Sequence, residues 1–220
     1  KHIAEICHYK QIIDLNLNLN HACYQKHGSE GKAGNKYMAS KFKRIFAVIM
    51  AATLVFGITA CGGGGKDPSK VKGETFDTGE FSVLVPDGWK LREISFSGEV
   101  DPSSVQIFKG AKEELDYFTT PYIYVRSCAN QDSVTDALTW AQAYDADSAE
   151  QLDAVTTGDF KWDAAKADTG SGSYGDMFIL TANEPYKFRI DIASEKDGTK
   201  LSLEDADVQA ILASLKETSK

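Results

Sequence analysis

The sequence predicts an α+β domain in which helices pack on an antiparallel β-sheet. Three observations lead to this fold class. From about Thr75 onward, apolar and polar residues alternate in several short runs, as in strands with one buried face. Two other segments repeat their apolar residues with helical period. Short turn segments separate neighbouring runs, so we expect the strands to pair antiparallel with their neighbours along the chain.

The first strands are expected in EFSVLVPDGWKLREISF, residues 80–96. Phe81, Val83 and Val85 fall on one face of an alternating run. Pro86-Asp87-Gly88 is a typical turn sequence, and the chain resumes with Trp89 and Leu91. The pattern predicts a β-hairpin, with one strand on each side of this turn.

Further strands are predicted at 104–109, 121–128, 159–167, 175–182 and 186–194. In the last of these, three apolar residues alternate with three charged ones. The apolar set is Phe188, Ile190 and Ile192, and the charged set is Lys187, Arg189 and Asp191. This alternation predicts a sheet with one face buried and the other in contact with solvent.

Two helices are predicted. Residues 133–145 place an apolar stripe along one side, with Asp132 or Ser133 as the N-cap. The C-terminal helix is expected to begin after Ser202, with Asp205 completing a near capping box. The two stripes are Val134, Leu138, Ala141 and Tyr144 in the first helix and Val208, Ile211, Leu212 and Leu215 in the second. The apolar face of the sheet is the expected partner of both.

The run Phe81-Ser82-Val83-Leu84-Val85-Pro86-Asp87-Gly88-Trp89 resembles the opening of the PsbP-like superfamily, which includes the Ran-binding import factors. A closing helix after an Ile-rich strand is similar to that group as well. The resemblance covers roughly residues 75–218 and implies a PsbP-like α+β domain. Members described in eukaryotes act as protein-binding accessory factors, and many bacterial lipoprotein members have no assigned role.

An uncharged apolar stretch, residues 45–60, precedes this domain and follows Lys41, Lys43 and Arg44. A basic segment, an apolar segment and small residues are the layout of a secretory signal peptide. The alternative is a transmembrane helix, but sixteen residues make a helix of roughly 24 Å, shorter than the hydrocarbon core of about 30 Å. A signal peptide is therefore expected over residues 38–60, with Met38 as its start.

The end of this stretch, Ile58-Thr59-Ala60-Cys61, resembles a bacterial lipobox. The resemblance implies cleavage after Ala60 and lipidation of the Cys61 thiol, with further acylation of the new amino terminus left open. Two or three acyl chains make a stable membrane anchor. The Gly-rich residues 61–74 are then expected to be a flexible tether to the domain at 75–218. The expected location is the outer face of the bacterial cytoplasmic membrane.

Residues 1–37 do not fit a signal peptide, and we interpret them as an untranslated upstream region or a disordered segment. The alternative is a metal site, because this region holds five Cys and His residues. These are Cys7, His8, His21, Cys23 and His27. They do not form the close pairs with regular spacing that place two ligands on one element. We therefore predict no metal and no cofactor.

Charge and composition exclude several functions for the part from Cys61 onward. This part holds sixteen Lys or Arg and twenty-nine Asp or Glu, a formal net charge of −13, which disfavours nucleic-acid binding. All four His lie upstream, so His-dependent catalytic triads are not available to it. Cys128 is its one cysteine besides Cys61 and is expected to be a small buried hydrophobe rather than a reactive thiol.

Two local clusters carry alternative interpretations. Asp145, Asp147 and Glu150 suggest calcium, but their spacing does not fit an EF-hand loop, and a solvated helix end is expected. Residues 170–175 are rich in glycine, but no strand-to-helix context or following Lys-Ser/Thr accompanies them. We interpret this segment as a hairpin connection rather than a phosphate-binding loop.

The sequence therefore predicts a membrane-anchored, non-catalytic binding or accessory module for a protein partner in the envelope. The alternative is a carboxylate-dependent enzyme that acts on envelope material. The expected partner surface lies in 115–125: if Ile123 and Val125 point into the core, Tyr122 and Tyr124 stand on the opposite face. Tyr117 and Phe118 would extend this aromatic patch. The other possibility is that a helix or loop covers this face.

Overall fold

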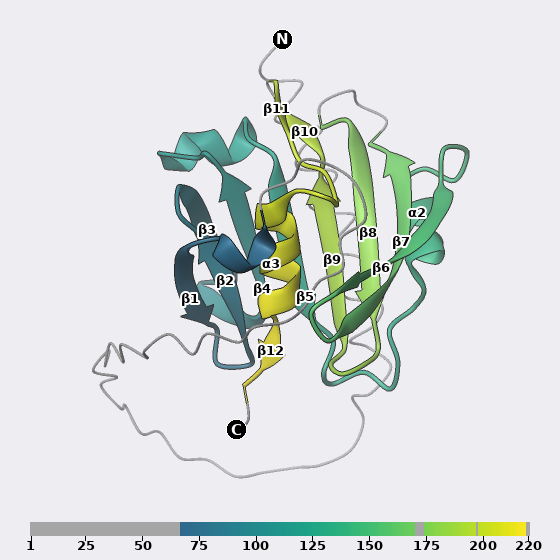
Figure 1. The fold of residues 1–220 in the computed structure, drawn as a ribbon, viewed down its shortest axis with the longest axis horizontal. Coiled ribbons are helices and arrows are strands. Elements are labelled where there is room, and N and C mark those ends of the chain that lie inside the picture. Colours follow the sequence, from purple (N-terminus) through teal and green to yellow (C-terminus); the bar gives the residue numbers. More distant parts are fainter. Residues whose placement is uncertain (1–66, 170–173, 197, 219–220) are drawn as a thin grey trace. The chain divides into compact units, whose positions relative to one another are not determined.

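A seven-stranded antiparallel sheet organises residues 67–169, 174–196 and 198–218, the part of the chain that the computed structural model describes (Figure 1). All of these residues belong to the unit Thr53–Lys220. The strand order is β3-β4-β5-β9-β8-β7-β6. The strands are β3 (Trp89–Phe96), β4 (Glu99–Lys109), β5 (Tyr122–Ser127), β6 (Glu150–Thr157), β7 (Phe160–Asp168), β8 (Asp176–Ala182) and β9 (Phe188–Ala193). The α+β class with a mostly antiparallel sheet is confirmed.

Strand alternation gives this sheet two distinct faces. One face carries the main hydrophobic core and packs against the C-terminal helix α3 (Ala206–Ser214). Its fully buried side chains include Val105, Ile107, Ile123, Val125, Trp162, Leu180, Ile190 and Ile192. The helix contributes Val208, Ile211 and Leu212, three members of the predicted apolar stripe. In Figure 1, α3 lies in front of the sheet and the second helix, α2 (Ala137–Tyr144), lies behind it.

A second sheet lies on the α3 side and has the order β1-β2-β12. Its strands are β1 (Gly73–Asp77), β2 (Phe81–Pro86) and β12 (Lys216–Glu217). Phe81 and Val83 of β2 are buried in the main core, and the Leu84 amide donates to the Ser214 hydroxyl of α3 at 2.8 Å. The second sheet and α3 therefore cover the same face of the large sheet.

The hairpin predicted across Pro86-Asp87-Gly88 is wrong, although the turn is present. The strand before the turn is β2, which pairs with β1 and β12, and the strand after it is β3, which pairs with β4. The turn therefore passes the chain from one sheet to the other. The physical reason is that β2 packs its Phe81 and Val83 face-on against the large sheet, which buries these side chains better than pairing at its edge.

The fold includes residues that precede the predicted boundary at residue 75. Asp67 caps a 3-10 turn, η2 (Pro68–Lys70), by accepting from the Ser69 amide at 3.0 Å. The chain then enters β1 at Gly73, which pairs with Pro86. A Cβ at Gly73 would meet the Val85 carbonyl oxygen, so this close strand approach requires glycine. Residues 67–74, expected as tether, are thus part of the fold, whereas 62–66 lie outside the described residues.

Both helices begin later than predicted. The N-cap of α2 is Asp136, whose carboxylate accepts from the Thr139 amide at 2.8 Å, rather than Asp132 or Ser133. Val134 remains outside the helix because its amide bonds to the Asn183 side chain at 2.7 Å. The N-cap of α3 is Asp205 rather than Ser202. The Ser202 amide donates to the Asp205 carboxylate in the turn before the helix, so the two predicted capping residues do interact.

The remaining elements are short. They are η3 (Glu114–Phe118), β10 (Glu195–Lys196) and β11 (Thr199–Lys200). The described strands confirm the segments predicted at 104–109, 121–128, 159–167, 175–182 and 186–194 within a few residues, whereas β1, β6, β10, β11 and β12 were not predicted. β7 and β8 pair antiparallel on either side of the glycine-rich segment, as a hairpin connection requires. Within the described ranges, no helix has the length and hydropathy needed to span a membrane.

Candidate binding face

Residues that the structure describes cover only part of the face of the large sheet opposite α3, here called the α2 face. Helix α2 packs on β6, β7 and β8. Ala165 and Ala167 point to this face from β7, and Ala137 and Ala141 are the buried residues of α2. Small side chains on both elements allow the helix to lie close to the sheet. The α2 face over β3, β4 and β5 retains half-buried side chains instead.

Strand β9 carries a buried ion pair that contacts helix α2. Arg189 donates from Nε and Nη2 to the two carboxylate oxygens of Asp191, both at 2.8 Å. Their side chains are only 4% and 3% exposed. Two parallel hydrogen bonds in this geometry form a strong charge-assisted pair. The prediction that Arg189 and Asp191 face solvent is wrong, because all six residues of β9 are buried.

Helix α2 supplies the groups that complete this ion pair. The Arg189 Cζ lies 3.8 Å from the ring centroid of Trp140, a cation–π contact. The Tyr144 hydroxyl donates to Asp191 Oδ2 at 3.1 Å. Burial, reinforced by the Asp191 charge, raises the pKa of Tyr144, so its hydroxyl stays protonated and remains a donor. These two interactions add polar contacts to the apolar packing that holds α2 on the sheet.

Strand pairing places a second arginine beside this pair. Arg126 on β5 is directly opposite Arg189, and Tyr124 is directly opposite Asp191. Burial disfavours the charge of Arg126, but Tyr124 and Asp191 outweigh it, so the pKa of the guanidinium is raised. Arg126 Nη2 donates to the Tyr124 hydroxyl at 3.0 Å, and its Cζ lies 5.0 Å from the Tyr124 ring centroid. Two guanidinium groups therefore lie next to one buried carboxylate.

The rows of cross-strand neighbours that contain Tyr124 and Arg126 continue from β5 across β4 toward β3, beyond the strands on which α2 packs. Gln106 is opposite Tyr124 on one side and opposite Arg92 on the other, so all three point to the α2 face. The Arg92 Cζ lies 5.8 Å from the ring centroid of Tyr117 on η3. We call the group Arg92, Tyr117, Tyr124 and Arg126 the arginine–tyrosine face. In each half of it, a guanidinium lies within cation–π distance of a tyrosine ring.

Aromatic side chains gather at the end of this face near η3. The Tyr117 ring packs on Phe108, with centroids 4.5 Å apart. Tyr122 contacts Phe108 and makes an edge-on contact with Tyr174 at 5.7 Å. On η3 itself, Phe118 is 48% exposed and Leu115 is 74% exposed. The half-buried rings of Tyr117 and Tyr122 and the more exposed apolar side chains of η3 therefore lie at the same end of the face.

The predicted site residues fall into three groups. Ile123 and Val125 are fully buried on the α3 side, so the prediction that Tyr122 and Tyr124 occupy the opposite face is confirmed. Both tyrosines are half-buried, which lies between the predicted surface and the core alternative. Tyr117 and Phe118 extend the same end of the face from η3. Ala60 and Cys61 lie outside the described residues, and binding of a partner by the four aromatic residues stays a prediction.

Sequence reasoning did not find the polar residues of this site, namely Arg126, Trp140, Tyr144, Arg189 and Asp191. One local signal was present. Opposite charges two residues apart on a strand, as at 189 and 191, point to the same face and can form a pair. The contribution of Arg126 had no such signal, because it depends on the pairing of β5 with β9.

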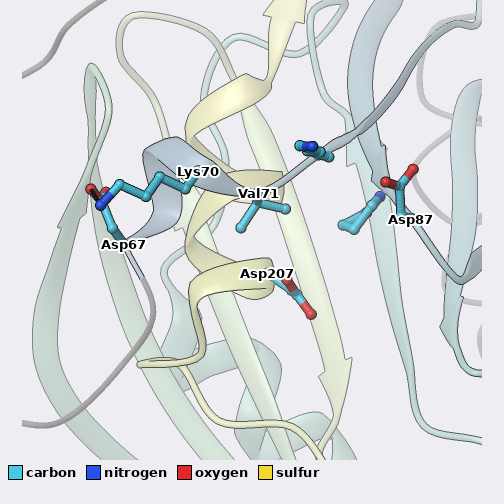
Figure 2. A pocket seen from close by; sticks show the side chains of 7 residues that line it. Asp67, Lys70, Val71, Asp87 and Asp207 are labelled. Carbon is cyan, nitrogen blue, oxygen red and sulfur yellow. Dashed lines mark ion pairs between the residues drawn. The ribbon is translucent and has the colours of Figure 1, made fainter.

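An enzyme of the predicted alternative class requires a pair of carboxylates, and three Asp residues line an open depression on the α3 side. Figure 2 shows Asp67, Asp87 and Asp207 around it, with Lys70 beside Asp67. Asp67 pairs with Lys70 at 3.5 Å, and hydrogen bonds from Ser69 lower its pKa. The carboxylate of Asp207 accepts from the Trp89 indole at 3.4 Å. The carboxylates of Asp67 and Asp207 therefore have separate partners.

The other predicted local features have ordinary structural roles. Cys128 is buried, as expected, and burial raises the pKa of its thiol. Asp145 accepts backbone amides of Asp147 and Ser148 in a turn after α2, and Glu150 pairs with Lys166 at 3.1 Å on β6 and β7. Among the described residues, no group of three or more Cys, His, Asp or Glu is placed to hold a metal ion.

Comparison with protein-family models, with curated proteins and with solved structures finds no match to this chain.

Proposed function

We propose that this protein is a lipid-anchored envelope protein that binds a protein partner through the arginine–tyrosine face. The observation that carries the proposal is the partial cover of the α2 face. Helix α2 packs on β6–β8, whereas the arginine–tyrosine face lies over β3–β5 and η3, with each guanidinium close to a tyrosine ring. Tyr and Arg are the residues most enriched at the centres of protein interfaces.

We propose further that the domain is PsbP-like. Three features support this assignment. Trp89 is buried at the turn that the opening motif predicts, β9 is an Ile-rich strand, and α3 closes the chain on the core. Helices on both sides of an antiparallel sheet are compatible with an accessory module that binds through one side of the sheet. The role in binding a protein partner rests on this resemblance and on the arginine–tyrosine face together.

The lipid anchor follows from the lipobox at Cys61 and from the position of Asp67. Only residues 62–66 separate the proposed lipidation site from the start of described structure. Six backbone steps span at most about 20 Å. The tether is therefore shorter than the predicted segment 61–74, and the domain is held near the head groups on its η2 side.

Replacing Cys61 with Ser is expected to release the protein from the membrane. The reason is that the thiol is the proposed attachment point and a single apolar segment of sixteen residues is too short to span the bilayer. Intact-mass measurement of the wild-type protein should show an added diacylglycerol and a chain that begins at Cys61. A Cys61→Ser variant that remains wholly in the membrane fraction after alkaline washing would contradict the anchor.

Replacing Tyr124 with Ser is expected to abolish capture of a cross-linked partner from the native membrane. Tyr124 is half-buried and lies at the centre of the arginine–tyrosine face, so its loss removes an aromatic anchor and the stacking surface of Arg126. The readout is the yield of the specific cross-linked species by mass spectrometry. Melting temperatures are measured in parallel, because a large loss of stability would assign Tyr124 to the core instead.

Tyr186→Ser is the matched control. Tyr186 is also half-buried, but its ring packs against Phe160 in the main core on the α3 side. This variant should lose stability and still capture the partner when measured below its melting temperature. Equal capture by wild-type protein and Tyr124→Ser would refute the binding role of the face.

A further inference from the structure

Three aromatic side chains present ring surface at the end of the arginine–tyrosine face near η3. They are Tyr117 and Phe118 on η3 and Tyr122 at the start of β5, and we call them the aromatic end. Tyr117 and Tyr122 are half-buried, and Phe118 is 48% exposed. The buried ring of Phe108 contacts both tyrosines and holds their rings in place. The aromatic end is therefore an apolar surface that is formed before a partner binds.

Charged residues of both signs flank the aromatic end. The cations are Lys90 and Arg92 on β3 and Lys112 before η3, and the anions are Glu113, Glu114 and Asp116. The Asp116 carboxylate is also occupied, because it accepts from the amides of Lys112 and Glu113 at 2.7 and 3.0 Å. Neither sign is in excess among these six residues, so a strongly charged ligand of either sign would meet like charges. Burial of the exposed ring surface favours an uncharged, apolar ligand instead.

A polyproline II segment matches both the rings and this balance of charge. Proline-rich segments are uncharged and dock on aromatic side chains with little loss of entropy, because their conformation is already formed. One turn has three residues and spans roughly 9 Å.

The positions of the two tyrosine rings allow this spacing. Phe108 lies 4.5 Å from Tyr117 and 5.6 Å from Tyr122, measured between ring centroids. The two tyrosine rings are therefore separated by at most these two distances together, and one turn of polyproline II falls within that limit. The carbonyl groups of such a segment have no internal hydrogen bonds, and the Tyr117 hydroxyl is of the type that can donate to them.

We propose that the aromatic end binds a proline-rich segment of the partner protein, with prolines one turn apart against Tyr117 and Tyr122 and a neighbouring proline against Phe118. This inference rests on the proposed function and specifies the chemistry of the partner. A membrane surface fits less well, because anionic head groups would repel the exposed Glu113 and Glu114.

The test measures binding of a fluorescently labelled decaproline peptide with blocked termini to the purified full chain. A labelled ten-residue peptide of alternating Gly and Leu is the control probe, because it is apolar and uncharged but flexible. Decaproline should bind at least about tenfold more tightly than the control peptide. Its affinity should change little as salt rises, since no charge on the peptide takes part. Equal binding of the two peptides would overturn the proposal.

Phe118→Ser and Tyr117→Leu should each weaken decaproline binding about tenfold, because each removes an aromatic ring from the surface. Phe118 is exposed, and Tyr117→Leu keeps an apolar side chain against Phe108, so both variants should fold normally. Phe96→Ser is the matched control. Phe96 is 40% exposed on β3, at the end of the β3–β4 hairpin away from η3, and its variant should bind as the wild type does. Equal losses in Phe118→Ser and Phe96→Ser would overturn the proposal.

The outcomes separate this inference from the proposed function. If decaproline does not bind but partner capture still depends on Tyr124, the face binds a partner of other chemistry and only the inference fails. If capture does not depend on Tyr124 either, the proposed function itself fails. A Phe118→Ser variant that binds decaproline normally but loses binding to phosphatidylglycerol vesicles would assign the aromatic end to the membrane and overturn the inference.

Discussion

Replacing Asp191 with Asn is expected to lower the free energy of unfolding by about 3–5 kcal/mol. The substitution keeps the shape of the side chain but removes the carboxylate that binds Arg189, which is 4% exposed. Burial leaves the guanidinium little contact with water, and Arg126 on the neighbouring strand adds a second positive charge. The Tyr144 hydroxyl also loses its charged acceptor. Urea unfolding followed by tryptophan fluorescence measures the loss, since all three tryptophans lie in the domain.

Two control variants separate the buried charge from other effects. Glu195→Gln breaks a pair with Lys200 whose side chains are 42% and 72% exposed, and it should cost less than about 1 kcal/mol. Replacing both partners, Arg189→Met with Asp191→Leu, should restore most of the stability lost in Asp191→Asn, because no unpaired charge remains. If Asp191→Asn unfolds at the wild-type urea concentration, Arg189 has another counter-ion and our description of the site is wrong.

Alternation and turn residues are sufficient to predict most of the large sheet, because most of its pairs join consecutive strands. β3 with β4, β4 with β5, β7 with β8 and β8 with β9 all follow this rule. The same reasoning fails at Pro86-Asp87-Gly88, where the turn connects two sheets. The local sequence shows that the chain turns there. The strands with which β2 pairs depend instead on the burial of Phe81 and Val83 in the main core.

The candidate site is less predictable, because its central row crosses the one pair of strands that is not consecutive. Arg126 meets Arg189 only through the pairing of β5 with β9. The strand β9 also looks amphipathic, yet α2 covers its polar side and buries Arg189 and Asp191. Alternating charged residues therefore predicted a solvated face where the fold has a buried ion pair. By contrast, Tyr122 and Tyr124 were placed on the correct face, because that prediction needs only the strand period.

Replacing Trp162 with Ala is expected to lower the free energy of unfolding by about 3–5 kcal/mol, the usual cost of removing a large aromatic side chain from a core. Trp162 on β7 is fully buried on the α3 side of the sheet. Its ring stacks on Phe160, with centroids 4.7 Å apart and planes inclined by 19°. Phe160 in turn contacts Phe188 edge-on at 6.0 Å. The cavity would therefore disrupt an aromatic cluster that joins β7 to β9, and urea unfolding measures the loss.

Trp162→Phe distinguishes the packing of this side chain from its polarity. The Trp162 indole Nε1 is buried and has no hydrogen-bond partner among the described residues. Phenylalanine keeps an aromatic ring against Phe160 and removes the unsatisfied donor. The stability lost through its smaller volume is partly offset, because no buried N–H group is left without a partner. The expected cost is below about 1.5 kcal/mol. A Phe variant as unstable as the Ala variant would mean that the indole N–H is satisfied, and that the aromatic cluster depends on this polar contact rather than on stacking.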